Sequence, residues 1–238
     1  MSAVYIRKHH TIIEMILRSL NADVLKSHGC LFGGGTAIAL RFGEYRESVD
    51  IDFMISDSNQ YRDLRSLITG KDGLASIFNI DGYAGLIAPV RTDQYGIRSN
   101  IRLLDAEVKF EIVREGRICF DTDNHLNQIC GVGALSTTDM MATKLLANSD
   151  RWADRGVFSR DLIDLSMIEI SDQQLQAARA KAIEAYGEAV LRDVTKAVSL
   201  VESVPKYLQQ CCLSMDISIP AAVVLMKVKQ FENRLTSK

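Results

Sequence analysis

Residues 31–55 read LFGGGTAIALRFGEYRESVDIDFMI, and this stretch decides the fold. Its short apolar run ends in Gly33-Gly34-Gly35, which is typical of a strand that leads into a glycine turn. Residues 36–42 then have helical periodicity. Residues 49–55 alternate between apolar and polar side chains, the pattern of a half-buried strand. The stretch therefore predicts a strand, a glycine turn, a helix and a second strand.

The second strand carries two acidic residues, Asp50 and Asp52, on one face. Successive side chains of a strand point to opposite faces, so the Cα atoms of this pair lie roughly 6.5–7 Å apart. Acidic residues are disfavoured in strands, and a divalent cation would relieve the repulsion between the two carboxylates. A solvated strand face is the plainer alternative. The other face of the strand is predicted to bury Val49, Ile51, Phe53 and Ile55.

A third carboxylate lies on another alternating segment, residues 106–113. Glu111 is on the polar face of this predicted strand. If the two strands are neighbours, Glu111 converges with the first acidic pair, and three carboxylates suit two divalent ions. Glu107 shares the polar face and is the rival third ligand, and Asp105 joins it if the strand starts earlier.

The glycines that precede the predicted helix suggest a phosphate site. Glycine lets backbone N–H groups approach a phosphate closely, and the N-terminus of a helix favours negative charge. An ordinary glycine turn capped by Thr36 is the alternative interpretation. The run matches neither G-x-G-x-x-G nor the G-K-[ST] ending of a P-loop, so alone it is a weak indication.

The remaining patterns predict an α+β protein. Helical spacing marks residues 5–26 and 59–68, whereas short runs rich in Ile, Val, Phe and Tyr within residues 77–120 indicate a meander of strands. Nearly every later segment has helical periodicity. We therefore expect a mixed sheet with flanking helices in residues 1–133 and a helical domain in residues 134–238.

Composition favours an ordinary globular protein. The 238 residues are 47% hydrophobic and 24% charged, with a formal net charge of −2, which argues against disorder. No segment approaches the ~18 apolar residues of a membrane helix, and residues 1–26 resemble an amphipathic helix rather than a signal peptide, so we expect a cytoplasmic protein. The five cysteines lack metal-ligand spacing and are expected to be reduced. Neither half of the chain has a strong basic excess, so contact with RNA requires a local patch.

The deciding stretch resembles a family signature. Gly34-Gly35-Thr36-Ala37, followed by Arg46-x-Ser48-x-Asp50-Ile51-Asp52-Phe53, is similar to the G-G-T-A-L…R-x-S-x-D-[IL]-D-[FL] pattern of the AbiEii/AbiGii-type nucleotidyltransferase toxins. These toxins belong to the DNA polymerase β-like nucleotidyltransferase superfamily and act in bacterial toxin–antitoxin systems. Fourteen residues separate Gly35 from Asp50, slightly more than in the family pattern, which indicates a small loop insertion.

Three later motifs resemble the same family, in the same order. Lys109-Phe110-Glu111 matches the strand that brings the third carboxylate. Residues 139–144 match D-x-x-x-x-K, and residues 160–165 match the R-D-h-x-D-h helix. The resemblance runs from about Phe32 to Leu165 and implies a nucleotidyltransferase-type sheet ahead of the helical domain.

The resemblance implies a reaction, its cofactor and its partners. Asp50, Asp52 and Glu111 would be catalytic residues that bind Mg²⁺ or Mn²⁺. A hydroxyl would attack the α-phosphorus of an NTP, and pyrophosphate would leave. The implied acceptor is RNA, such as a tRNA 3′ end, and the implied protein partner is an antitoxin.

The resemblance also implies nucleotide contacts. Lys144 would reach the triphosphate, and its alternative is a solvated helix lysine. Arg46 and Ser48 would orient their loop or contact phosphate, whereas an ion pair of Arg46 with Glu44 or Glu47 is the plainer possibility. The backbone at the start of the predicted helix would contact phosphates through Gly34, Gly35 and Thr36.

Asp161 would be a late catalytic acid near the nucleotide or the acceptor. Its alternative role is a first-turn helix carboxylate, with Ser159 as the cap. Asp164 shares the same helix face and is the rival acid. Three clustered arginines are the local candidates for RNA phosphate contacts: Arg151, Arg155 and Arg160.

Two other functions remain open at this stage. One is an enzyme of the same fold that modifies a small molecule, as kanamycin nucleotidyltransferase modifies an antibiotic. The other is a non-catalytic interaction module whose acidic strand face is merely solvated.

Overall fold

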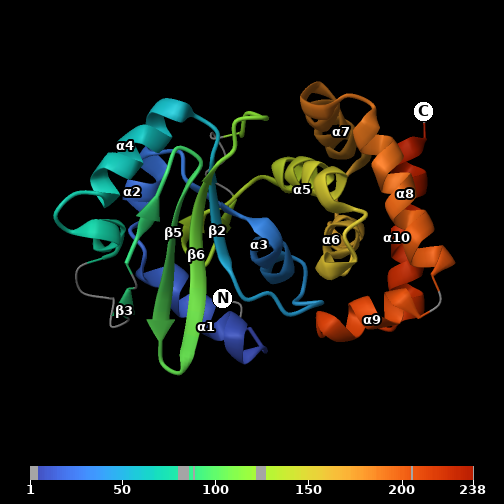
Figure 1. The fold of residues 1–238 in the computed structure, drawn as a ribbon, viewed down its shortest axis with the longest axis horizontal. Coiled ribbons are helices and arrows are strands. Elements are labelled where there is room, and N and C mark those ends of the chain that lie inside the picture. The colour runs from blue at the N-terminus through green and yellow to red at the C-terminus, as the bar shows by residue number, and fades with distance from the viewer. Residues whose placement is uncertain (1–4, 80–85, 88, 122–126, 205, 238) are drawn as a thin grey trace. The chain divides into compact units, whose positions relative to one another are not determined.

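The computed structural model describes residues 5–79, 86–87, 89–121, 127–204 and 206–237 (Figure 1). The chain divides into two compact units. Unit 1 combines Met1–Glu44 with Ser48–Ser136, and unit 2 combines Tyr45–Glu47 with Thr137–Lys238. The predicted domain boundary after residue 133 lies close to the division between Ser136 and Thr137. The grouping of Tyr45–Glu47, a segment ahead of the acidic strand, with the helices was not predicted from the sequence.

Among the described residues, unit 1 contains a mixed sheet of six strands in the order β1-β2-β6-β5-β3, with β4 paired to β5. β2 and β6 run parallel, and the other neighbouring pairs are antiparallel. The strands are β1 (Leu31–Gly33), β2 (Ile51–Ile55), β3 (Leu86–Ile87), β4 (Arg91–Thr92), β5 (Gly96–Leu103) and β6 (Ala106–Arg114), and a separate pair is formed by β7 (Gln128–Ile129) and β8 (Val132–Gly133).

One face of this sheet is buried, because apolar side chains alternate along its central strands. Helices α1 (Lys8–Ser19) and α4 (Ser58–Ile68) contact the sheet (Figure 1). The rings of Phe32, Phe53 and Phe110 lie in series, with successive centroids 5.5 and 5.7 Å apart. Each fully buried side chain of this kind stabilises the fold by roughly 1.5–3 kcal/mol. The solvent-excluded residues of the two central strands are Ile51, Phe53, Ile55, Val108, Phe110 and Ile112.

Val49 is not on the buried face, contrary to the prediction from its alternation. Strand β2 begins at Ile51, whose partner in β6 is Phe110, so Val49 and Asp50 precede the paired residues. Without a partner strand, Val49 remains 43% exposed. The predicted meander is present as β3 to β6 in the described part of residues 77–120, and residues 80–85 and 88 lie outside it.

The helices of unit 1 differ in their bounds from the predicted ones. The helix expected over residues 5–26 is interrupted, because Asn21 begins α2 (Ala22–Ser27) by accepting a hydrogen bond from the Val24 N–H at 3.1 Å. Helix α3 (Gly34–Arg41) follows β1 directly and begins at the second glycine. A short 3₁₀ helix, η1 (Gly73–Ile77), follows α4.

Unit 2 is helical, as the periodicity predicted. Helix α5 contacts α6, α7 and α8, and α10 contacts α6 and α8 (Figure 1). A sheet-containing unit together with a helical unit confirms the predicted α+β class. The helices are α5 (Thr137–Arg151), α6 (Arg160–Met167), α7 (Asp172–Tyr186), α8 (Ala189–Ser203), α9 (Tyr207–Ser214) and α10 (Ala221–Thr236), with the 3₁₀ helix η2 (Arg155–Val157) before α6. In the part of the chain that the structure describes, no helix has the length and apolar character needed to span a bilayer.

Candidate active site

Asp52 and Glu111 are direct partners in the parallel pairing of β2 with β6. Neighbouring strands lie about 4.8 Å apart, and paired residues of parallel strands point to the same face, so the two side chains stand side by side. That face is opposite the buried apolar one, and both carboxylates are partly exposed. The structure therefore brings together two of the three predicted metal ligands from strands far apart in the sequence.

Lys109 links the third predicted ligand, Asp50, to this pair. Its ammonium group donates to Glu111 at 2.6 Å. This hydrogen bond raises the pKa of Lys109, and the negative charges of Asp50 and Asp52 raise it further. Asp50 therefore acts on Lys109 through its charge and precedes the strand, whereas Glu111 contacts Lys109 directly.

Glu111 is held on its other side by Arg98, whose Nε donates to its second carboxylate oxygen at 3.0 Å. Among the described residues, no three His, Cys, Asp or Glu side chains are grouped closely enough to hold a metal ion. The chemistry of the carboxylate set nonetheless fits Mg²⁺, which takes oxygen ligands and is held by one or two carboxylates together with phosphates. A divalent cation here would take the place of Lys109 and Arg98 as the counter-charge of Glu111.

The register distinguishes Glu111 from its rivals. Glu107 is paired with Arg102 in β5 and lies four residues before Glu111, about 13 Å along the strand. Its carboxylate accepts from Asn100 at 2.6 Å and from Arg102 at 3.0 Å. Asp105 lies in the turn before β6 and pairs with Lys8 at 2.5 Å. Of the candidate third acids, Glu111 is therefore the one beside Asp52.

The start of α3 fits closely against Asp52. Gly34 has a φ of +71°, and a β-carbon at that position would lie 2.5 Å from Asp52 Oδ2. Thr36 is the third residue of the helix rather than its cap, and its hydroxyl donates to Ser48 Oγ at 2.8 Å. The glycine turn therefore places the N-terminus of α3 beside the acidic strand.

A buried histidine that sequence reasoning missed supports the segment ahead of β2. His10 Nε2 accepts from the Ser48 backbone N–H at 3.1 Å, and its Nδ1 lies 2.7 Å from Glu44 Oε1. These contacts require the neutral tautomer with the proton on Nδ1, because Nε2 must act as an acceptor. His10 lies in an amphipathic helix, and nothing in that pattern signals a partner 38 residues away.

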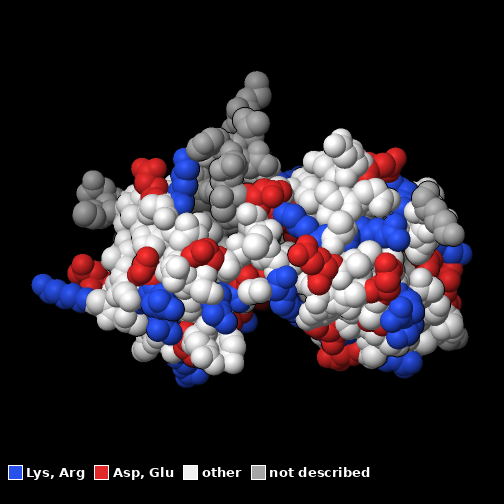
Figure 2. Space-filling view, turned by 90° about the horizontal axis from the view of Figure 1, so that it is seen from above, with Lys and Arg blue, Asp and Glu red and all other residues white. Residues whose placement is uncertain are grey.

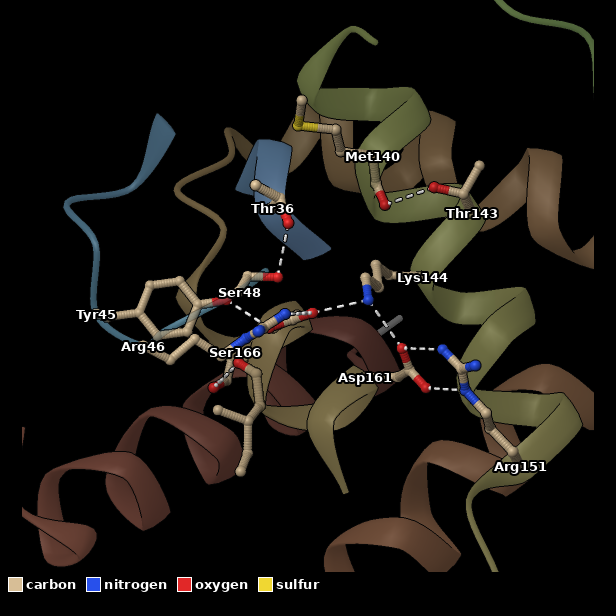
Figure 3. Close-up of polar contacts among 12 residues, drawn as sticks. Thr36, Tyr45, Arg46, Ser48, Met140, Thr143, Lys144, Arg151, Asp161 and Ser166 are labelled. Carbon is tan, nitrogen blue, oxygen red and sulfur yellow. Dashed lines mark hydrogen bonds and ion pairs between the residues drawn. The ribbon is translucent and has the colours of Figure 1, made fainter. Parts of the chain in front are cut away.

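Unit 2 contains a buried cluster of charged side chains (Figure 3). The Lys144 ammonium lies 2.8 Å from Asp161 Oδ1 and 2.7 Å from Asp164 Oδ2. Arg151 also pairs with Asp161, through contacts of 2.5 and 2.9 Å. Burial opposes ionisation of Asp161, but the Lys144 and Arg151 charges outweigh it and hold the pKa of Asp161 well below its ordinary value.

Arg46 and Tyr45 complete this cluster from the segment ahead of β2. Arg46 donates to both oxygens of Asp164, at 2.7 and 2.9 Å, and the Tyr45 hydroxyl donates to Asp164 Oδ1 at 2.5 Å. The ion-pair partner of Arg46 is therefore Asp164, and not Glu44 or Glu47 as in the alternative interpretation, although Arg46 also donates to the Glu47 backbone carbonyl at 2.8 Å. Burial favours the neutral form of Asp164, yet the Arg46 and Lys144 charges keep its pKa lowered.

The cluster contains several of the residues that the later sequence motifs singled out, among them Lys144, Asp161 and Asp164. Lys144 is buried between two carboxylates rather than solvated on the helix surface. Ser159 stands at the N-cap position of α6 but its side chain makes no capping hydrogen bond, and its hydroxyl donates to Tyr207 at 3.2 Å instead. Asp161 and Asp164 both contact Lys144, so they act together as its counter-charges. Of the three arginines considered for RNA contacts, Arg151 binds Asp161 and Arg155 lies over the Tyr207 ring.

A pocket of about 380 Å³ lies beside the carboxylates of unit 1. It has three cationic side chains in its lining, and two of them, Arg98 and Lys109, also contact Glu111. On the face of the molecule in Figure 2, by contrast, Lys and Arg are interspersed with Asp and Glu and form no broad basic area. The sequence analysis did not predict the pocket; the polar residues Arg98, Asn100 and Arg102 at alternate positions of β5 are the pattern that could have indicated it. Its lining consists of Pro89, Arg91, Arg98, Ser99, Asn100 and Lys109.

Carboxylates on adjacent strands, next to a helix that begins at a glycine turn, agree with the arrangement that the sequence motifs imply. Residues 16–235 match the family model described as nucleotidyl transferase AbiEii toxin, type IV toxin–antitoxin system. The chain belongs to this family, which confirms the resemblance seen in its motifs. It is therefore a nucleotidyltransferase of the AbiEii toxin family.

Two solved structures from Helicobacter pylori are similar to the chain. JHP933 is 18% identical with a TM-score of 0.53, over 97% of this chain and 95% of that one. A candidate nucleotidyltransferase is 19% identical with a TM-score of 0.47, over 95% of this chain and 94% of that one. At this level of identity the JHP933 likeness supports a shared fold. A search of curated proteins found no match.

Proposed function

We propose that this nucleotidyltransferase toxin is metal dependent and transfers NMP from an NTP to a hydroxyl of an RNA acceptor, with a tRNA 3′ end as the first candidate. The observation that carries the proposal is the pairing of Asp52 with Glu111 on the open face of the sheet. The ion pair of Lys109 with Glu111 at 2.6 Å supports it, because this carboxylate already holds a positive charge.

Asp50, Asp52 and Glu111 are the proposed metal ligands. A bound Mg²⁺ or Mn²⁺ would activate the acceptor hydroxyl and neutralise charge on the leaving pyrophosphate. The chain itself contributes the placement of these carboxylates, which the β2–β6 pairing and the close approach of Gly34 hold in position. Positioning and charge neutralisation are the contributions expected to dominate in such transfers.

The start of α3 is the proposed site of the nucleotide phosphates. Gly34 and Gly35 carry no side chain, so their backbone N–H groups are accessible to a phosphate, and the helix N-terminus adds a favourable dipole. The hydrogen bond from Thr36 to Ser48 fixes the turn relative to the segment that leads into β2.

The Lys144 cluster has two proposed roles. The first is positioning: through Asp164 it holds Arg46, four residues before Asp50. The second is the predicted contact of Lys144 with the triphosphate, which requires the nucleotide to replace one of its carboxylate partners, Asp161 or Asp164. Membership of a type IV toxin–antitoxin family supports an antitoxin as the protein partner.

The test of the proposed function is transfer of label from α-³²P NTP to total tRNA with wild type, Asp52→Asn and an Asp50→Ala, Asp52→Ala double variant. We expect the label in the RNA to fall by at least ~100-fold in each variant, because electrostatic stabilisation at the reacting phosphate is lost. Circular dichroism of each variant checks the fold. Full transfer by a folded double variant would refute the metal assignment, and labelling of aminoglycosides instead of tRNA would refute the RNA acceptor.

A further inference from the structure

The pocket beside Glu111 has a cationic lining without a carboxylate. Arg91, Arg98 and Lys109 line it together with the polar residues Ser99 and Asn100. A volume of about 380 Å³ is within the usual range for small-ligand sites. The pocket therefore has the size and the charge to receive an anionic group.

Strand register explains why the cations gather there. Arg91 in β4 is the direct partner of Arg98 in β5, and Asn100 in β5 is the direct partner of Lys109 in β6. Like charges directly opposite each other destabilise a sheet, so the Arg91–Arg98 pairing has an energetic cost. An anion bound between these side chains would remove that cost.

The cations differ in their counter-charges. Arg98 pairs with Asp93 at 3.0 Å and with Glu111 at 3.0 Å, and Lys109 pairs with Glu111. Among the described residues, the side chain of Arg91 has neither an ion-pair nor a hydrogen-bonding partner. The lining of the pocket therefore includes a guanidinium group whose charge no described residue neutralises.

The pocket also offers apolar surface. Most of the surface that lines it is apolar, and Pro89 is one of the lining residues. Arginine planes and apolar stems support a nucleobase or a ribose, while guanidinium groups bind phosphate oxygens. A nucleotide unit satisfies both kinds of surface, whereas a bare inorganic anion uses the charges alone.

Lys109 places the pocket next to the carboxylates, since it lines the former and donates to Glu111 at 2.6 Å. A cationic aminoglycoside would be repelled by three cations at this position, whereas an RNA strand carries one negative phosphate per nucleotide and would be attracted. Resting on the proposed function, we propose that the Arg91–Arg98–Lys109 pocket binds a phosphate-bearing nucleotide near the 3′ end of the acceptor strand.

The test is equilibrium binding of a short, fluorescently labelled single-stranded RNA to wild type, Arg91→Gln and Arg91→Lys. Arg91 is exposed and contacts none of the proposed catalytic residues, so the variants should fold. Arg102→Gln is the matched control. Arg102 is an arginine of the same sheet, in β5, but it binds Glu107 and does not line the pocket.

We expect Arg91→Gln to weaken RNA binding roughly 3–10-fold and to lower the salt dependence of log K by about 0.7, the loss of one phosphate contact with a single strand. Arg91→Lys should restore part of the affinity, and Arg102→Gln should bind like wild type. NTP affinity, measured by calorimetry with Mg²⁺, should be unchanged in Arg91→Gln.

Equal RNA affinity of Arg91→Gln and Arg102→Gln would overturn the proposal. Weaker NTP binding with unchanged RNA binding would overturn it too, since the pocket would then hold the triphosphate of the substrate. The two proposals can fail separately. Loss of RNA affinity in Arg91→Gln supports the pocket even if Asp52→Asn retains transfer. Wild-type RNA affinity in Arg91→Gln together with loss of transfer in Asp52→Asn supports the carboxylate site alone.

Discussion

Gly34 stands so close to Asp52 that a β-carbon on the glycine would lie 2.5 Å from Asp52 Oδ2. The backbone of Gly34 is also in the left-handed region, with a φ of +71°. A side chain at this position would therefore push a proposed metal ligand and strain the turn at the same time. The absence of a side chain at Gly34 is therefore what allows the start of α3 to lie directly beside Asp52.

The Gly34→Ala variant should lose transfer activity by more than its stability loss accounts for. We expect a backbone cost of about 1–2 kcal/mol in the free energy of unfolding, from the positive φ, and in addition a displaced Asp52 carboxylate. The matched control is Gly43→Ala, because Gly43 has a φ of +82° but open space around its Cα. Urea unfolding and label transfer measure the two effects. Similar activity in the two variants would show that the contact with Asp52 is unimportant.

Exchanging single carboxylates for amides along β6 should reveal which acid is functional. Glu111→Gln should reduce transfer at least ~100-fold, because Glu111 is the register partner of Asp52. Glu107→Gln should stay within a few-fold of wild type, because Glu107 binds Arg102 and Asn100 away from the site. Initial rates at saturating NTP distinguish the two. A greater loss in Glu107→Gln would reassign the third acid.

Removing Asp164 should destabilise the protein severely. Asp164→Ala leaves Arg46 and Lys144 buried with one carboxylate fewer, and breaking such a buried pair costs about 3–5 kcal/mol. Asp172→Ala is the control, because the Asp172 side chain is 88% exposed and its pair with Arg234 should contribute less than about 1 kcal/mol. If Asp164→Ala is too unstable to purify, Asp164→Asn removes the same negative charge and keeps the size and shape of the side chain. Equal midpoints of urea unfolding for Asp164→Asn and Asp172→Ala would contradict the role of the cluster.

The same cluster predicts the acid limit of stability. Neighbouring cations lower the pKa of Asp161 and of Asp164 in the folded protein, against the opposing effect of burial. A lowered folded pKa stabilises the protein above the unfolded value of about 3.9, and this contribution is lost as pH falls further. We expect the melting temperature to fall progressively below about pH 4, and to fall less steeply in Asp161→Asn. Parallel curves for the two proteins would show that Asp161 is not responsible.

The polar and apolar alternation of β2 and β6 could be predicted from the sequence, because a half-buried strand must place Ile51, Phe53 and Phe110 on the face away from water. The identity of Asp52 and Glu111 as candidates followed from the same pattern. Their pairing could not be predicted, since it depends on which strands become neighbours. Val49 showed the limit of the pattern, because alternation continues beyond the residues that have a partner strand.

The charged cluster of unit 2 was beyond sequence reasoning for a different reason. Lys144 and Asp161 were noticed through their motifs, but helical periodicity gives the face of a residue and not its counter-ions. Arg46 and Asp164 are 118 residues apart, and nothing local marks them as partners. His10 was missed for the same reason.

The segment Tyr45–Glu47 limits where the polypeptide can be cut into independent fragments. It packs with residues 137–238, so the backbone passes between the two units at three places rather than one. A fragment that starts at Thr137 would lack Tyr45 and Arg46, leaving the Asp164 carboxylate with Lys144 alone. Unit 2 is thus completed by three residues that precede the acidic strand. A cut between residues 136 and 137 leaves both fragments incomplete, because it separates Tyr45 and Arg46 from Asp164.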